Sequence, residues 1–179
     1  MDERRFRLAR LFVQGAAANM QEVLKYYLSR NKDVAEPLHT ITDLITNIND
    51  NMKLEALMAI EGNIREAYYS AFNTIIDKND FVFAGRTRRP PGDRINALIS
   101  FGNTMAYTAC LSEIYRTHLD PRISFLHTTN FRRFSLNLDI AEIFKPILVD
   151  RIIFYLLARN MLKGTDFEKR AGGILLNHK

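Results

Sequence analysis

The sequence predicts an all-α fold: a helical bundle with a central bent apolar helix. Apolar residues recur at helical spacing along most of the 179 residues, whereas the alternation typical of a strand is limited to Phe81–Phe83. A hydrophobic fraction of 47% and a charged fraction of 25% are ordinary for a globular protein. A chain of this length can bury one core, so we expect a single domain over residues 1–179.

Three helices are predicted in the first half of the chain. The first spans about 2–29 and carries the small residues Gly15–Ala18, where another helix can approach closely. The second spans about 34–48 and the third about 53–77. The apolar stripe of the third helix consists of Leu54, Leu57, Met58, Ile64, Tyr68, Ala71, Phe72 and Ile75.

Prolines divide the second half of the chain. Residues 79–92 form the longest irregular stretch, and Asp93 is the predicted N-cap of a helix that continues to about residue 117. After a second loop-rich segment, Ser135 is expected to cap a long apolar helix that Pro146 bends. No strand is predicted in the final residues.

Composition excludes several classes of protein. The single cysteine, Cys110, excludes a disulfide framework and a thiolate metal cluster, and it fits a reducing compartment. The charged N-terminus lacks the apolar run of a signal peptide, and Asp150 and Arg151 interrupt the apolar stretch Ile147–Ala158, which is too short to span a membrane. We therefore expect a soluble, cytoplasmic protein. Its net charge of +5 favours polyanionic partners.

Acidic residues interrupt two otherwise apolar helices. Glu61 lies inside the stripe of the third helix, and Asp139 and Glu142 interrupt the apolar residues of 136–157. A carboxylate on a buried face costs several kcal/mol unless a cation, a metal or hydrogen-bond donors compensate it. The cations that could neutralise these acids are Lys145, Arg65 and Arg94.

His127 offers a different explanation for the same acids. It precedes the helix that presents Asp139 and Glu142 at i, i+3 on one face, and Glu61 could join them from a distant helix. Two carboxylates and one imidazole suit Mn²⁺ or Mg²⁺, with water or phosphate oxygens as the remaining ligands. Spacing alone leaves open both the metal site and a core histidine beside ion-paired acids.

Three arginines, Arg86, Arg88 and Arg89, lie together in the irregular segment. The guanidinium fork suits phosphate oxygens, although a solvated loop would have the same composition. Beside a metal site on a basic protein, contact with a nucleic-acid backbone is the better interpretation.

These motifs, in their order along the chain, resemble the CRISPR-associated integrase family, protein one of the spacer-acquisition machinery. The similar segments are Leu8-Ala9 to Leu24, Glu61-Gly62 with Tyr68-Tyr69, Arg86 to Gly102, Leu119-Asp120-Pro121 with Phe125-Leu126-His127, Ser135 to Pro146, and Asp150-Arg151. His118 and Ser124 stand where the family usually has glycine, and Lys145 replaces a common arginine. These departures leave the expected ligands intact.

The resemblance implies a catalytic domain. Glu61, His127 and Glu142 would bind Mn²⁺ or Mg²⁺, Asp139 would be a further catalytic acid, and Arg86, Arg88 and Arg89 would bind DNA. The implied activity is the metal-dependent cleavage and joining of phosphodiesters in double-stranded or branched DNA, together with a companion, CRISPR-associated protein two, in a prokaryotic cytoplasm.

The match begins almost at the first residue. We therefore expect the family's N-terminal β-rich domain, which pairs two subunits, and its C-terminal tail to be absent, so that homodimerisation is weakened. Two alternatives are a non-catalytic DNA-binding or assembly module, and a structural helical bundle whose buried acids are ion-paired.

Overall fold

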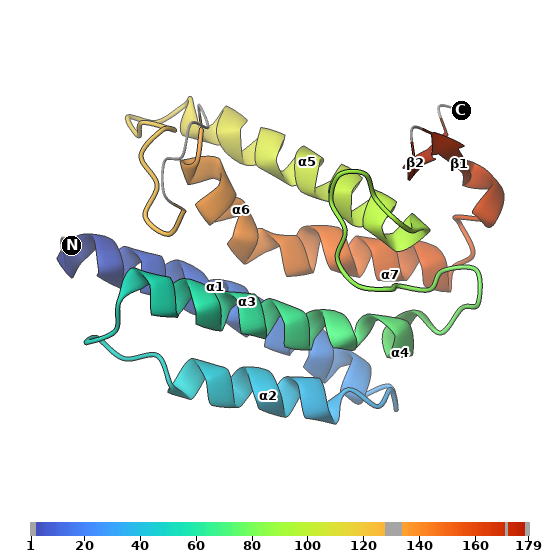
Figure 1. Ribbon diagram of the computed structural model, residues 1–179, viewed down its shortest axis with the longest axis horizontal. Coiled ribbons are helices and arrows are strands. Elements are labelled where there is room, and N and C mark those ends of the chain that lie inside the picture. Colours follow the sequence, from blue (N-terminus) through green and yellow to red (C-terminus); the bar gives the residue numbers. More distant parts are fainter. Residues whose placement is uncertain (1–2, 128–133, 171, 178–179) are drawn as a thin grey trace.

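The computed structural model describes residues 3–127, 134–170 and 172–177, and its elements are predominantly helical (Figure 1). The helices are α1 (Glu3–Leu28), α2 (Ala35–Thr46), α3 (Leu54–Ser70), α4 (Phe72–Ile76), α5 (Arg94–Ile114), α6 (Leu136–Lys145), the π-helical turn η1 (Pro146–Asp150), α7 (Arg151–Ala158) and the 3₁₀ turn η2 (Gly164–Asp166). The strands are β1 (Phe167–Arg170) and β2 (Gly173–Leu176). The predicted all-α class is confirmed, since the two strands form a single small hairpin.

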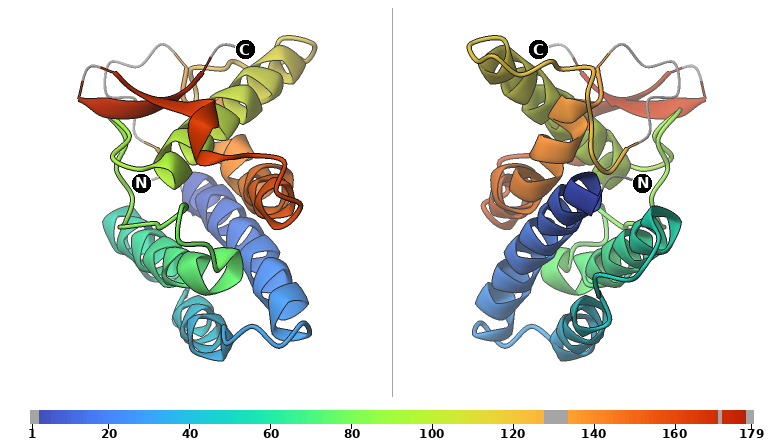
Figure 2. Two further views of the ribbon diagram at one scale, coloured as in Figure 1. Left: turned by 90° about the vertical axis from the view of Figure 1, so that its right-hand side faces the viewer. Right: turned by 90° about the vertical axis from the view of Figure 1, so that its left-hand side faces the viewer.

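The helices lie in two layers (Figures 1 and 2). One layer contains α1, α2 and α3, which all contact one another, and the other contains α5 with the consecutive elements α6, η1 and α7. Helix α1 joins the layers because it packs against α6 and η1 as well as against α2 and α3. Among the described residues, no helix is both long and apolar enough to cross a membrane.

Helix α3 is buried on the predicted stripe with one exception. Leu57, Ile64 and Tyr68 are almost completely buried, but Met58 is 39% exposed. The prediction for Met58 was wrong because this residue lines the wall of a cavity. The predicted single helix is also interrupted at Ala71, after which the short helix α4 continues to Ile76.

Helix α5 has a capped N-terminus. The Asp93 side chain accepts a hydrogen bond from the backbone N–H of Asn96 at 2.7 Å, which confirms the predicted N-cap. The buried Asn96 amide donates to the carbonyl of Gly85 at 2.7 Å and accepts from the N–H of Thr87 at 2.9 Å. One buried asparagine therefore holds the preceding loop, residues 77–93, against α5.

The long apolar helix lacks the predicted side-chain cap but bends at Pro146, as predicted. Ser135 does not cap it with its side chain, because the hydroxyl donates instead to the carbonyl of Arg122 at 3.0 Å. At Pro146 the backbone opens into the π-helical turn η1, since proline has no N–H for the α-helical hydrogen bond. Val149 in this turn lies under Gly102 of α5, where an added Cβ would be 2.5 Å from Val149 Cγ1.

The C-terminal hairpin was not predicted. β1 and β2 pair antiparallel, with Phe167 opposite Leu176 and Arg170 opposite Gly173. Phe167 packs on Phe81 with ring centroids 5.8 Å apart, and the N–H of Ile174 donates to the carbonyl of Pro91 at 2.9 Å. The hairpin therefore supports the loop 77–93 from outside the bundle (Figure 1).

Asp150, at the end of η1, is a buried acid whose pKa departs from its ordinary value. Burial raises the pKa of its carboxyl from 3.8 to about 7, against the opposing influence of Lys145 and Arg65. The folded protein therefore holds this proton more tightly than the unfolded chain does.

We expect Asp150 to make folding less favourable as pH rises. The penalty is absent below about pH 4, grows as the pH rises towards 7, and amounts to up to about 4 kcal/mol above that. Asp150→Asn should therefore have a higher free energy of unfolding than the wild type at about pH 8, and the two should converge at about pH 4. Urea denaturation across this range measures the difference, with Asp43→Asn on an exposed residue as control. A variant less stable than the wild type at pH 8 would show that Asp150 is ionised and paired.

Candidate active site

Two carboxylates from separate layers meet at the guanidinium of Arg65. Arg65 Nε donates to Glu61 Oε1 at 3.0 Å, and Arg65 Nη2 contacts both Glu61 Oε1 and Glu142 Oε2, the latter at 2.6 Å. Glu61 and Arg65 lie one turn apart on α3, whereas Glu142 lies on α6. Of the cations considered from the sequence, Arg65 thus contacts both of the acidic residues among the three predicted metal ligands.

Glu142 contacts two cations in this site. Its side chain is 9% exposed, and Lys145 Nζ lies 2.9 Å from both of its oxygens. Burial raises the pKa of Glu142, but Arg65 and Lys145 lower it by a larger amount. The resulting pKa is about 2. Glu142 is therefore an anion at neutral pH, held by cations on two sides.

Asp139 organises the loop that carries His127. Its fully buried carboxylate accepts hydrogen bonds from the backbone N–H groups of Phe125, Leu126 and His127 at 2.7, 3.0 and 3.2 Å. The same carboxylate lies 2.6 Å from His127 Nδ1. Asp139 thus fixes the imidazole ring, and Nε2 remains the ring nitrogen that Asp139 does not engage.

The three predicted metal ligands line one cavity. Its volume is about 890 Å³, and its wall includes Glu61, Glu142 and the half-buried His127. The cations on the same wall are Arg65, Arg86, Arg88, Arg89 and Lys145. Asp139 lies behind this wall, because it is completely buried.

The residues fit a divalent cation by their chemistry. Within residues 3–127, 134–170 and 172–177, no three His, Cys, Asp or Glu side chains converge on a point that could hold a metal ion. The two carboxylates nevertheless already share one cation, the Arg65 guanidinium, and His127 has the carboxylate-supported imidazole that is typical of metal ligands. Two carboxylates and one imidazole would suit Mn²⁺ or Mg²⁺.

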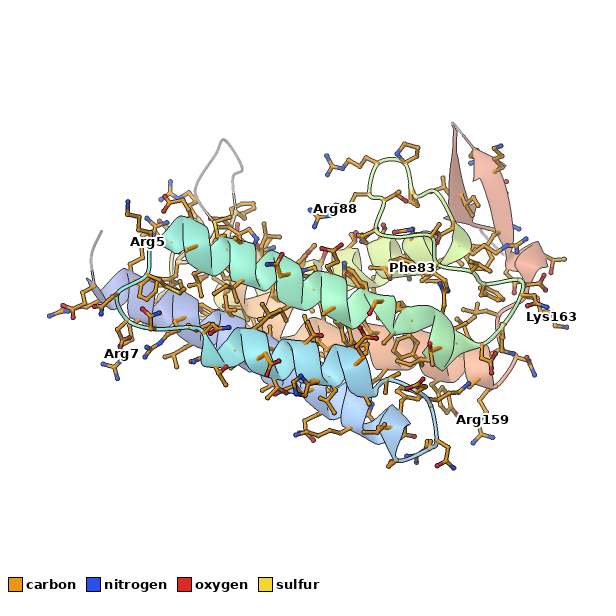
Figure 3. All side chains as sticks on the ribbon, turned by 60° about the horizontal axis from the view of Figure 1, so that its bottom comes forward. Arg5, Arg7, Phe83, Arg88, Arg159 and Lys163 are labelled. Carbon is orange, nitrogen blue, oxygen red and sulfur yellow. The ribbon has the colours of Figure 1, made fainter. Side chains whose placement is uncertain are left out.

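The three arginines of the basic loop have different surroundings. Arg86 is half-buried and donates to Asn96 Oδ1 at 2.8 Å and to Ser100 Oγ at 3.2 Å, and burial lowers its pKa. Arg88 and Arg89 are exposed at the cavity and form no hydrogen bond or ion pair with other residues in the described ranges. Figure 3 shows Arg88 extending from the loop beside α3. Arg88 and Arg89 are thus free to bind a ligand, whereas Arg86 holds the loop.

Helix α5 contributes a polar face that the sequence reading missed. Ser100, Asn103 and Tyr107 all line the cavity, and the buried Oδ1 of Asn103 has no hydrogen-bond partner among the described residues. Tyr107 lies between Glu142 and Lys145 of α6, with its hydroxyl 3.4 Å from Glu142 Oε1 and 3.3 Å from Lys145 Nζ. The spacing i, i+3, i+7 is one helical face, so the signal was present in the sequence.

The chain matches the family described as CRISPR associated protein Cas1 over residues 1–179. The CRISPR-associated endonuclease Cas1 2 of Thermodesulfovibrio yellowstonii is 55% identical over 98% of this chain and 53% of that protein. The CRISPR-associated protein Cas1 1 of Methanobrevibacter ruminantium is 46% identical over 98% of this chain and 52% of that protein. The chain therefore spans about half the length of the curated relatives it matches.

Solved structures also match this chain over about half of their own length. A Cas1 protein from Thermotoga maritima superposes with a TM-score of 0.88 at 43% identity, over 98% of this chain and 54% of that one. A casposase bound to an integration product has a TM-score of 0.87 at 22% identity, over 99% and 52%, and shares the fold. A chain of a partial Cas6-RT-Cas1–Cas2 complex has a TM-score of 0.81 at 25% identity, over 94% and 53%.

Loss of the Asp139 carboxylate should destabilise the protein far more than loss of the imidazole it contacts. Asp139→Ala leaves three backbone donors without their acceptor and should cost about 3 to 5 kcal/mol, whereas His127→Ala removes a half-buried ring and should cost about 1 kcal/mol. Urea denaturation at neutral pH compares the two variants. Equal losses would mean that the loop does not depend on Asp139.

Proposed function

The chain belongs to the CRISPR-associated protein Cas1 family, and from this premise we propose that it is the catalytic domain of a metal-dependent DNA endonuclease and integrase. The observation that carries the proposal is the cavity in which Glu61, Glu142 and His127 share one wall with five cations. Acidic ligands beside exposed arginines suit a reaction at a phosphodiester, because the acids would bind metal while the arginines bind phosphate.

Each residue has a distinct role in this proposal. Glu61 and Glu142 would hold Mn²⁺ or Mg²⁺ together with Nε2 of His127, the ring nitrogen that Asp139 does not engage. When bound, the cation would supply Lewis-acid activation of the phosphodiester. Arg88 and Arg89 would bind the DNA backbone at the cavity mouth and orient the strand towards the acids.

Substrate and partner follow from the relatives. We infer that the substrate is double-stranded or branched DNA, and that the assembled protein works with CRISPR-associated protein two. The similar chain in a partial Cas6-RT-Cas1–Cas2 complex supports this partner. The basic cavity supports a polyanionic substrate.

A structural bundle with ion-paired acids is the second candidate. It is favoured by the Arg65 bridge and by Lys145, which neutralise Glu61 and Glu142 through protein groups alone. The two candidates differ in their response to metal. A metal-binding site gains stability from Mn²⁺, because the ion binds the folded state, whereas a purely structural site does not.

We expect His127→Ala to separate catalysis from binding. The change removes a metal ligand but no arginine of the cavity mouth, so affinity for branched DNA should persist while Mn²⁺-dependent cleavage falls by at least about a hundredfold. Cleavage of a labelled branched duplex with Mn²⁺, and with EDTA as the metal-free arm, measures the effect. The control is His118→Ala, which changes an exposed histidine outside the cavity. Cleavage at the wild-type rate by His127→Ala would show that this histidine is not a metal ligand.

The double change Arg88→Ala and Arg89→Ala should instead weaken DNA binding irrespective of sequence. If each side chain contacts one phosphate, the slope of log affinity against log salt should decrease by up to about two. Fluorescence anisotropy at several salt concentrations measures the slope. The matched control changes Arg159 and Lys163 to alanine, since neither lines this cavity. An unchanged slope in the Arg88, Arg89 variant would exclude the basic loop from the DNA path.

A further inference from the structure

One nitrogen atom of Arg65 stands where two carboxylates from different helices meet. Nη2 contacts Glu61 on α3 and Glu142 on α6, and the side chain is 14% exposed. Lys145, the other buried cation here, contacts Glu142, but within the described residues it forms no hydrogen bond or ion pair with Glu61. Arg65 is therefore the cation that connects the two acids.

The carboxylate oxygens that Arg65 contacts, Glu61 Oε1 and Glu142 Oε2, are also the oxygens that would bind a metal ion. A divalent ion binds carboxylate oxygens at about 2.0 to 2.6 Å, and a guanidinium donating to the same oxygens occupies that space. A divalent ion and the Arg65 guanidinium at the same carboxylates would also repel each other, more strongly in a partly buried site than in water. An ion shared by Glu61 and Glu142 and the present position of Arg65 Nη2 are thus mutually exclusive.

We propose that Arg65 is a tethered cation that holds Glu61 and Glu142 together before a divalent metal binds, and that the metal displaces it. The inference rests on the proposed function, since it concerns the same acids. Arg65 remains attached to α3 one turn from Glu61, so the displaced guanidinium stays within the cavity. Its fork then matches the oxygens of a DNA phosphate.

This exchange couples metal and DNA. A phosphate that binds the guanidinium removes the competitor of the metal, and a metal that displaces the guanidinium frees it for the phosphate. By linkage, each ligand should then raise the affinity of the other by the same factor. Arg65 is a positioning residue in the metal-free state and a phosphate contact in the loaded state.

The test is the affinity for Mn²⁺ alone, measured by calorimetry on the wild type and on Arg65→Met, which keeps an unbranched stem and removes the charge. We expect Arg65→Met to bind Mn²⁺ about tenfold more tightly or better, because the cation that contacts both Glu61 and Glu142 is removed while Lys145 still contacts Glu142 alone. Without metal the variant should melt at a lower temperature, because Glu61 and Glu142 then repel each other, and Mn²⁺ should restore the loss. A short DNA duplex should raise the Mn²⁺ affinity of the wild type but not that of Arg65→Met.

Two further variants make the result decisive. Arg88→Met removes one charge from the same cavity without breaking the bridge, so its Mn²⁺ affinity should change less than about threefold. Arg65→Lys keeps the charge without the fork, and it should bind Mn²⁺ with intermediate affinity even if Arg65→Met does not fold. If the wild type binds Mn²⁺ and neither Arg65 variant binds it more tightly than Arg88→Met, the displacement is refuted. If neither the wild type nor any variant binds Mn²⁺, the proposed function itself fails.

Discussion

The contact between Arg65 and Glu142 joins the two helical layers at the candidate active site. Helix α3 packs on α1, α2 and α4, and α6 packs on α1, α5 and η1, so the two helices share a neighbour in α1. Between α3 and α6 themselves, the contact at this site is the ion pair of Arg65 and Glu142 and not apolar packing. A buried ion pair contributes little net stability, but removing one partner is costly. The geometry of the cavity therefore depends on a polar contact that a ligand can rearrange.

Around this bridge, buried polar side chains fix the loops that the helices leave open. Asn96 holds the loop 77–93 through backbone groups, and Asp139 holds the loop before residue 128 in the same manner. Each uses a side chain on a rigid helix to satisfy donors or acceptors that the loop cannot satisfy itself. The basic loop and the histidine loop thus acquire defined positions although neither forms a strand or a helix.

Periodicity was sufficient for the helices because their buried faces are long and apolar. It also revealed Glu61 and Glu142, since a carboxylate in an apolar stripe is conspicuous by itself. The hairpin escaped notice because its first strand, Phe-Glu-Lys-Arg, is mostly charged. The hairpin packs on the loop through the ring of Phe167 in β1 and the backbone N–H of Ile174 in β2. Arg86 was assigned to DNA with its neighbours, because only the fold brings Asn96 and Ser100 within its reach. That Arg65 contacts both acids depends on how α3 faces α6, which spacing within one helix cannot reveal.

Gly102 sets the closest approach of α5 to η1, since its missing side chain makes room for Val149. The same α5 carries Ser100, Asn103 and Tyr107 to the cavity, and η1 continues directly from the helix that carries Glu142. The width of the cavity therefore depends on the apolar contact between Gly102 and Val149, which lies outside the cavity. A substitution at residue 102 would therefore change how Tyr107 lies against Glu142 without changing any polar group.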